Sequence, residues 1–257
     1  MTEITLSDTR PKLWRDFKII DETDAYIVID KPPLLLVHPS KPDRTVTLLD
    51  ELRRLLVFEI ANGGQVSIVN RLDRETSGIV LVAKTAAAAR EFGLLMQARR
   101  IRKEYHAIVW GWPEWDSKVV DAPIIRQGEI ASSPIYLKQT IDKRGAQATT
   151  KFQVVRRIAK RTTNGERFAF IKANSQTGRM HQIRVHLTST GHPVVGDKIY
   201  GPDEHLYLRF IEMGWTAALA RELLLDRHAL HASRLTIDGE RHWRSALPAD
   251  WSDWWSA

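Results

Sequence analysis

The sequence predicts an α+β domain built on a mixed, largely antiparallel β-sheet with flanking helices. Strand-like segments outnumber helical ones, and the helices stand between only some of the strands, without a regular βαβ rhythm. Two alternating segments on either side of Asn164-Gly165 predict a hairpin. The 257 residues contain no internal repeat and no Gly/Ser-rich or Pro-rich linker. We therefore expect residues 1–257 to form a single domain.

The individual elements follow from periodicity and from turn residues. The segment 17–33 predicts two strands separated by a polar turn at residues 21–24. A helix over residues 47–60 is predicted from leucines at helical spacing, namely Leu48, Leu49, Leu52, Leu55 and Leu56. The other predicted elements are strands at 66–69, 79–84, 103–112, 148–158, 167–175 and 228–237, and helices at 85–100 and 177–191. Thr85 is the expected N-cap of the helix at 85–100, with basic residues in its last turn.

Composition limits the class of function. There are 38 Lys and Arg residues against 31 Asp and Glu residues, which gives a net charge of +7 and favours a polyanionic partner, either nucleic acid or an anionic membrane. No apolar run approaches the ~20 residues that span a bilayer. The opening residues MTEITLSDTRPK lack the pattern of a signal peptide. The absence of cysteine excludes disulfides, thiolate nucleophiles and Cys-based metal sites. These features predict a cytoplasmic protein.

The segment VNRLDRETSGIVLVAKT, residues 69–85, places Asp73 between Arg71 and Arg74 in a short polar gap between two apolar runs. Loops held between rigid strands often carry reactive groups. A solvated surface turn explains the segment equally well when it is taken alone.

Two further segments carry polar side chains in an ordered pattern. In KEYHAIVWG, residues 103–111, a strand puts Lys103 and Tyr105 on one face and Glu104 and His106 on the other. Taken alone, this segment is explained more simply by a half-buried tyrosine in the core.

In TGRMHQIRVH, residues 177–186, a helix would place Met180, Ile183 and Leu187 on its apolar face and His181 and Arg184 on a flanking stripe. His181 and His186 lie roughly 140° apart around such a helix, so they do not form a two-histidine metal site.

Taken together, NRLDRETSG, KEYHAIVWG and TGRMHQIRVHLTSTGHPVVGDKIYG resemble the RluA family of RNA pseudouridine synthases. The similarity covers residues of about 17–237 and leaves a Trp-rich tail at 238–257, which we expect to pack on the core. The resemblance implies a central RNA-binding cleft and isomerisation of a uridine that is first flipped out of its stack. It implies no metal, redox or nucleotide cofactor.

The resemblance also implies the site residues. Asp73 is the expected nucleophile or base, and attack on the sugar, attack on the uracil ring and removal of a sugar proton all stay open as routes. Arg184 would keep Asp73 ionised, and Tyr105 would stack on the uracil and help to remove the proton from the ring carbon. The residues expected to contact RNA are Arg71, Arg74, Lys103, Arg179, His181 and Ile183. The basic runs at 98–103 and 156–161 are candidate phosphate contacts.

The sequence departs from the family pattern at two positions. The family usually has His where Asn70 stands and Gly where Leu34 stands. The first catalytic strand begins near Phe17, so we expect no small RNA-binding domain before it. The expected partner is a stem-loop of transfer RNA or large-subunit ribosomal RNA, bound by a monomer that needs no protein partner.

Two other functions are compatible with parts of the sequence. A non-catalytic RNA-binding protein would share the basic charge but would not need Asp73, Tyr105 and Arg184 together. A hydrolase or nuclease with a carboxylate pair would have to use Asp73 and Glu75, which point to opposite sides in extended chain.

Overall fold

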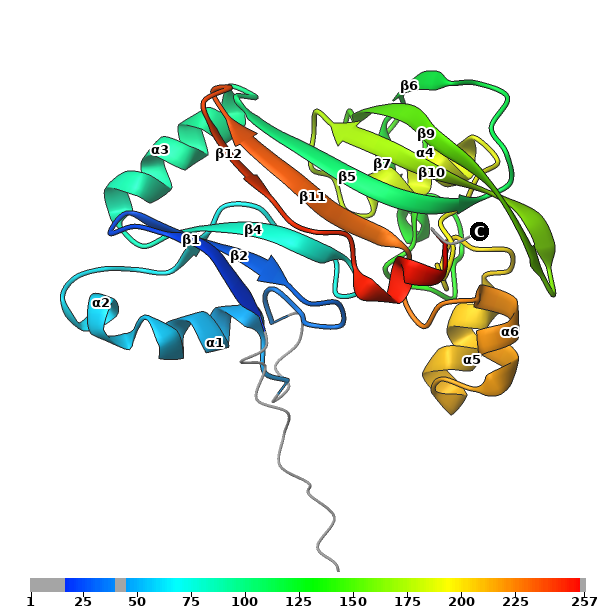
Figure 1. Ribbon diagram of the computed structural model, residues 1–257, viewed down its shortest axis with the longest axis horizontal. Coiled ribbons are helices and arrows are strands. Elements are labelled where there is room, and N and C mark those ends of the chain that lie inside the picture. The colour runs from blue at the N-terminus through cyan, green and yellow to red at the C-terminus, as the bar shows by residue number, and fades with distance from the viewer. Residues whose placement is uncertain (1–16, 40–44, 255–257) are drawn as a thin grey trace, which may run out of the picture.

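The structure is a computed structural model, and it describes residues 17–39 and 45–254 (Figure 1). Ten strands form one sheet, in which β1, β2, β4, β11, β5, β10, β9 and β6 lie side by side in that order. Their bounds are β1 Lys18–Glu22, β2 Tyr26–Lys31, β3 Ser67–Ile68, β4 Ser77–Ala83, β5 Ile101–Trp110, β6 Ser117–Asp121, β9 Thr149–Thr162, β10 Gly165–Ser175, β11 Leu230–Ile237 and β12 Arg241–Arg244. Of the pairs in this sheet, β4 with β11 is parallel and the others are antiparallel. The predicted mixed, largely antiparallel sheet is confirmed.

Strand β11 is the junction of the sheet. One of its edges pairs with β5, while the other edge pairs first with β4 at His231 and Ala232 and then with β12. The contact with β4 is close, because a Cβ atom on Gly78 would lie 2.2 Å from the carbonyl oxygen of Ala232. Gly78 also has φ of 108°, a conformation that favours glycine. The start of β4, and the loop that precedes it, are therefore held against the middle of the sheet.

The helices flank the sheet at both ends (Figure 1). Their bounds are α1 Leu48–Leu55, α2 Val57–Ala61, α3 Ala86–Gln97, α4 Gln182–Ser189, α5 His205–Met213 and α6 Ala217–Leu223. A small second sheet joins β7 Ile124–Arg126 to β8 Gln139–Ile141, and short 3-10 helices, η1 and η2, span Gln127–Glu129 and Ala249–Trp254. Within the described part of the chain, no helix combines the length and the apolar character needed to cross a lipid bilayer.

Two helix predictions need correction. The helix predicted at 47–60 is divided at Leu56, whose ψ of 27° ends α1, and Leu55 is exposed although it belongs to the leucine pattern. Helix α3 has the predicted cap, since the amide of Ala88 donates to the Thr85 hydroxyl, but it ends at Gln97. Its last turn therefore holds no basic residue, because Arg99 lies beyond its end with a left-handed φ of 56°.

The tail packs on the core, as predicted. Trp251 is fully buried and its ring meets those of Phe170 and His231, while Trp254 packs edge-on against Phe168. Trp255, the last tryptophan of the tail, lies outside the described residues.

Candidate active site

A cavity of about 260 Å³ lies between the loop of residues 69–76, strand β5 and the start of α4. We call residues 69–76 the Asp73 loop; it joins β3 to β4. The polar side chains in the cavity lining are Asn70, Arg71, Asp73, Thr76, Lys103, Tyr105, Ser175, Thr177, Arg179, His181, Gln182 and Arg184. The cavity therefore brings together residues of all three segments that carried the sequence prediction, and Asp73 and Arg184 are 111 positions apart.

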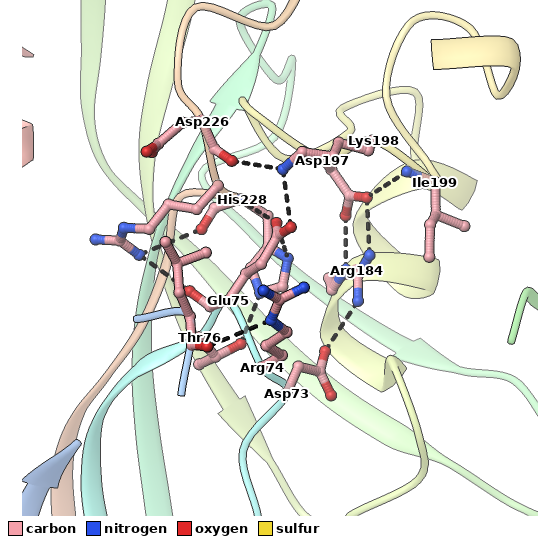
Figure 2. A network of polar contacts seen from close by, with 12 residues as sticks. Asp73, Arg74, Glu75, Thr76, Arg184, Asp197, Lys198, Ile199, Asp226 and His228 are labelled. Carbon is pink, nitrogen blue, oxygen red and sulfur yellow. Dashed lines mark hydrogen bonds and ion pairs between the residues drawn. The ribbon is translucent and has the colours of Figure 1, made fainter. Parts of the chain in front are cut away.

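Asp73 is held by an ion pair across the cavity (Figure 2). The Nη1 atom of Arg184 donates to Oδ2 of Asp73 at 3.0 Å. Arg184 is itself fixed from the other side, because its Nε and Nη2 atoms donate to the two carboxylate oxygens of Asp197 at 2.7 and 2.9 Å. Asp197 is fully buried and also accepts the backbone N–H groups of Ile199 and Tyr200. The guanidinium thus has one orientation, and its free edge meets Asp73.

The surroundings keep Asp73 ionised. Burial raises the pKa of its carboxyl, but His181, Arg184 and His228 lower it by more, and the resulting pKa is about 2. Burial, and then Arg184, lowers the pKa of His181 to about 4, so His181 is neutral near pH 7. Arg184, by contrast, stays a cation beside Asp73. A carboxylate that is charged at neutral pH and about a quarter exposed can act as a nucleophile or a base.

The neighbouring carboxylate, Glu75, has a different environment. It accepts from Nζ of Lys198 at 2.8 Å and from the backbone N–H of His228 at 3.0 Å (Figure 2). Burial raises the pKa of Glu75, but the hydrogen bond and charge of His228 and those of Lys198 hold it well below its usual range. Glu75 does not line the cavity, so Asp73 and Glu75 do not form a carboxylate pair. The geometry does not support the hydrolase or nuclease interpretation.

Buried groups fix the backbone of the Asp73 loop. Lys31 is fully buried and its Nζ donates to the carbonyl of Arg74 at 3.2 Å and to two carbonyls of its own segment. The Thr76 hydroxyl lies 2.7 Å from Nε2 of His228. The side chain of Asn70 makes two hydrogen bonds with the backbone of β4. Its Nδ2 donates to the carbonyl of Ile79, and its Oδ1 accepts from the amide of Leu81.

The structure explains what the two departures from the family pattern do here. Asn70 is buried, and its two backbone bonds tie the Asp73 loop to β4. Leu34 has φ of 68°, the left-handed region that favours glycine, and its carbonyl accepts from Nε of Arg74. A glycine at position 34 would take this conformation without strain.

Tyr105 faces Asp73 from β5. It is buried, and burial followed by the charge of Asp73 raises its pKa, while a hydrogen bond with Ser175 acts in the opposite direction. Tyr105 is therefore a neutral phenol at pH 7. Lys103 also lines the cavity, so the predicted shared face of these two side chains is confirmed.

The residues predicted to contact RNA divide into two groups. Arg71 and Arg179 line the cavity rim and are exposed, and Ile183 supplies part of its apolar wall. Arg74 does not line the cavity, because its guanidinium turns to the carbonyl of Leu34. His181 lines the cavity but is buried, neutral near pH 7 and 2.8 Å from the hydroxyl of Tyr200, so it offers no charge to a phosphate.

The predicted helix at 177–191 is shorter than expected. It begins at Gln182 after His181, which has a left-handed φ of 56°, and Met180 is therefore exposed instead of lying on its apolar face. Ile183 and Leu187 are buried as predicted.

Sequence reasoning missed the residues that hold the site residues in place. Asp197, His228 and Lys31 are all buried beside the Asp73 loop or Arg184. Asp197 could have been identified from the sequence, because it follows Gly196 within one of the three segments that carried the resemblance. Within the described part of the chain, no group of three or more His, Asp or Glu side chains is arranged to hold a metal ion.

Comparison with known proteins agrees with the site geometry. The family model described as RNA pseudouridylate synthase matches residues 25–189. The ribosomal large subunit pseudouridine synthase D of Nitrosomonas europaea is 35% identical over 242 residues, which cover 91% of this chain and 62% of that protein. The protein of the same name from Pseudomonas aeruginosa is 35% identical over 240 residues, covering 91% of this chain and 69% of that protein.

A solved structure shows the same fold. The human RNA pseudouridylate synthase domain containing 1 superposes with a TM-score of 0.65 at 23% identity, over 93% of this chain and 86% of that chain. The matching segment of the family model includes Asp73, Tyr105 and Arg184. The resemblance to the RluA family is thereby confirmed, and the chain belongs to the RNA pseudouridylate synthase family.

Proposed function

We propose that this protein isomerises a specific uridine of an RNA to pseudouridine, with Asp73 as the indispensable group. One observation carries the proposal: a carboxylate with a pKa of about 2, oriented by Arg184, stands in a cavity opposite a neutral buried tyrosine. The isomerisation breaks the bond between the sugar and a ring nitrogen and forms a bond from the sugar to a ring carbon. The proton on that carbon leaves, and the freed nitrogen gains one. No outside oxidant, reductant or water is consumed.

The cavity suits one flipped pyrimidine. Ile183 and Leu230 offer an apolar wall, and the ring of Tyr105 offers a stacking face. Asp73 then reaches either the sugar carbon, as a carboxylate does in retaining glycosidases, or the uracil ring, or a sugar proton. The neutral hydroxyl of Tyr105 assists the loss of the ring-carbon proton as a relay, not as a strong base. Arg71, exposed at the rim, is positioned to stack where the flipped base has left the helix.

The names of the relatives point to the substrate. Two relatives that are 35% identical to this chain are named as synthases of the ribosomal large subunit. We therefore place a stem-loop of large-subunit ribosomal RNA first and transfer RNA second as the substrate. The proposal includes action in the cytoplasm, which is supported by the absence of cysteine, and action as a monomer.

The test compares Asp73→Asn with the wild type on a stem-loop RNA, with pseudouridine detected by chemical derivatisation. Asp24→Asn is the matched control, since Asp24 is exposed in the turn between β1 and β2. We expect Asp73→Asn to bind RNA and to form no product, while Asp24→Asn turns over normally. Binding without conversion by the wild type would instead support a non-catalytic RNA-binding protein. Appreciable turnover by Asp73→Asn would exclude the assigned role.

A further inference from the structure

A second hollow adjoins the cavity at the end of the sheet. It shares Lys103 and Ser175 with the cavity, and we call it the basic groove. Its lining residues are Arg99, Ile101, Arg102, Lys103, Glu104, Lys151, Asn174, Ser175, Gln176, Arg234, Thr236 and Gly239. Five of these side chains are cations and one is a carboxylate, so the groove strongly favours an anion.

Most of the groove lies on the face of the sheet opposite Tyr105. Glu104 pairs with Asn174 of β10 and with Arg234 of β11, so these three side chains share one face. Tyr105 is the next residue of β5 and points to the other face. The 3-10 helix η2 covers this face farther along, where Trp251 meets Phe170, and no residue of η2 lines the groove.

The charges of the groove cations are available to a ligand. Within residues 17–39 and 45–254, Arg99, Arg102, Lys151 and Arg234 make no ion pair, in contrast to Arg100, which pairs with Asp238. The Nε atom of Arg234 is buried, and no atom of the described residues accepts a hydrogen bond from it. Such a donor costs free energy until it is satisfied, and a phosphate oxygen satisfies it with a charge-assisted bond.

We propose that the basic groove binds the phosphates of the RNA strand that continues from the flipped nucleotide, so that the substrate passes over the end of β5 and β10 onto the opposite face of the sheet. The inference rests on the proposed function and extends it. Lys103 lines both hollows and so joins them, and Arg102 and Arg234 continue the path of positive charge from it. A neutral ligand would leave the guanidinium groups unpaired. Phosphate contacts position an RNA without reading its bases, so the groove would increase affinity and set the direction of the strand.

The test uses the full chain and two RNAs, a stem-loop cut at the base of the stem and the same stem-loop with single-stranded 5′ and 3′ flanks. We expect Arg234→Gln to raise KM for the flanked RNA roughly fivefold or more at low salt, and to leave KM for the trimmed RNA and kcat for both almost unchanged. The slope of log affinity against log salt should fall by about 0.7 for each phosphate of the single strand that the variant no longer neutralises.

Two further variants separate binding from folding. Lys151→Gln changes an exposed groove cation and should reproduce the effect in the same direction, whereas Arg90→Gln changes an exposed cation on α3 that lines neither hollow and should have no effect. Equal KM values of the wild type for both RNAs, or groove variants that match Arg90→Gln, would overturn the inference. A wild type that converts no uridine in either RNA would refute the proposed function instead, and the salt dependence of flank binding would still test the groove.

Discussion

Replacement of Arg184 by methionine tests how the site keeps Asp73 ionised. The pKa of Asp73 is about 2 against an ordinary value of 3.8, although burial alone would raise it. A difference of roughly two units corresponds to about 2.5 kcal/mol in favour of the charged form. Arg184→Met removes the guanidinium group and its 3.0 Å hydrogen bond to Asp73 but leaves the burial. The pKa of Asp73 should therefore rise, and turnover at pH 7 should fall about 100-fold or more because the carboxylate is no longer oriented.

The single variant also leaves Asp197 charged and fully buried without its partner, which costs roughly 3–5 kcal/mol of folding free energy. The double variant Arg184→Met with Asp197→Asn removes that stranded charge and is the appropriate companion. Both proteins are first checked by thermal unfolding.

The assay is kcat/KM for pseudouridine formation between pH 4 and pH 9. The wild type should show no acid limb from Asp73 in this range, since a group with a pKa of about 2 is ionised throughout it. The variants should show an acid limb at higher pH. A folded variant with near-normal turnover and an unchanged profile would refute the assigned role of Arg184.

Three other predictions concern Tyr105, Asp250 and the two carboxylates bonded to Arg184. Tyr105→Phe keeps the ring but removes the oxygen, so release of tritium from the ring carbon of labelled uridine should slow by roughly 100-fold while RNA binding is retained; unchanged release would exclude the relay role. Asp250→Ala leaves the buried Arg227 without its two carboxylate bonds and should lower the free energy of unfolding by about 2 kcal/mol, as denaturant titration can show; an unchanged midpoint would mean that the tail does not hold Arg227. Because the pKa values of Asp73 and Asp197 are each depressed to about 2, the stability that they add is present above pH 3.8 and is lost as the pH falls through 2. Asp197→Asn should make the loss of stability at low pH less steep. A loss as steep as in the wild type would argue against a contribution of Asp197 to the pH dependence of stability.

The sequence was sufficient for the elements that rest on local patterns. Alternation along residues 103–112, the predicted strand, placed Lys103 and Tyr105 on one face, and the cap at Thr85 marked the start of α3. The polar segment between two apolar runs placed Asp73 in a loop between strands, and the structure puts it between β3 and β4. Its assignment as a site residue came from the family resemblance of the three segments together, because the loop alone fitted a surface turn equally well.

What failed depends on contacts between distant segments. The leucine pattern at 47–60 does not reveal that the chain leaves the helix at Leu56, because packing on the core decides which leucine is buried there. Met180 fits a helical stripe, but the left-handed backbone of His181 starts α4 after it. The charge of His181 is removed by burial, which no local pattern reveals.

The supporting ion pairs were equally hidden. Glu75 bonds to Lys198, 123 positions away, and Arg227 bonds both to Asp250 of the tail and to the carbonyl of Glu75. The bonds of Arg227 connect the Asp73 loop to η2, which contains Asp250. The pairing of β11 with strands on both of its edges brings these residues together. No single segment of the sequence specifies the order of the strands in the sheet.

The proposed function is tested most directly by a map of pseudouridines in total RNA from cells with and without the gene, and from cells that carry Asp73→Asn. We predict that pseudouridine disappears at a defined uridine, in large-subunit ribosomal RNA by preference, both in the deletion and in the Asp73→Asn strain. Restoring the wild-type gene should restore it at the same position. Identical maps in all strains, or a modification that persists with Asp73→Asn as the sole copy, would contradict the proposed function and the role of Asp73 in it.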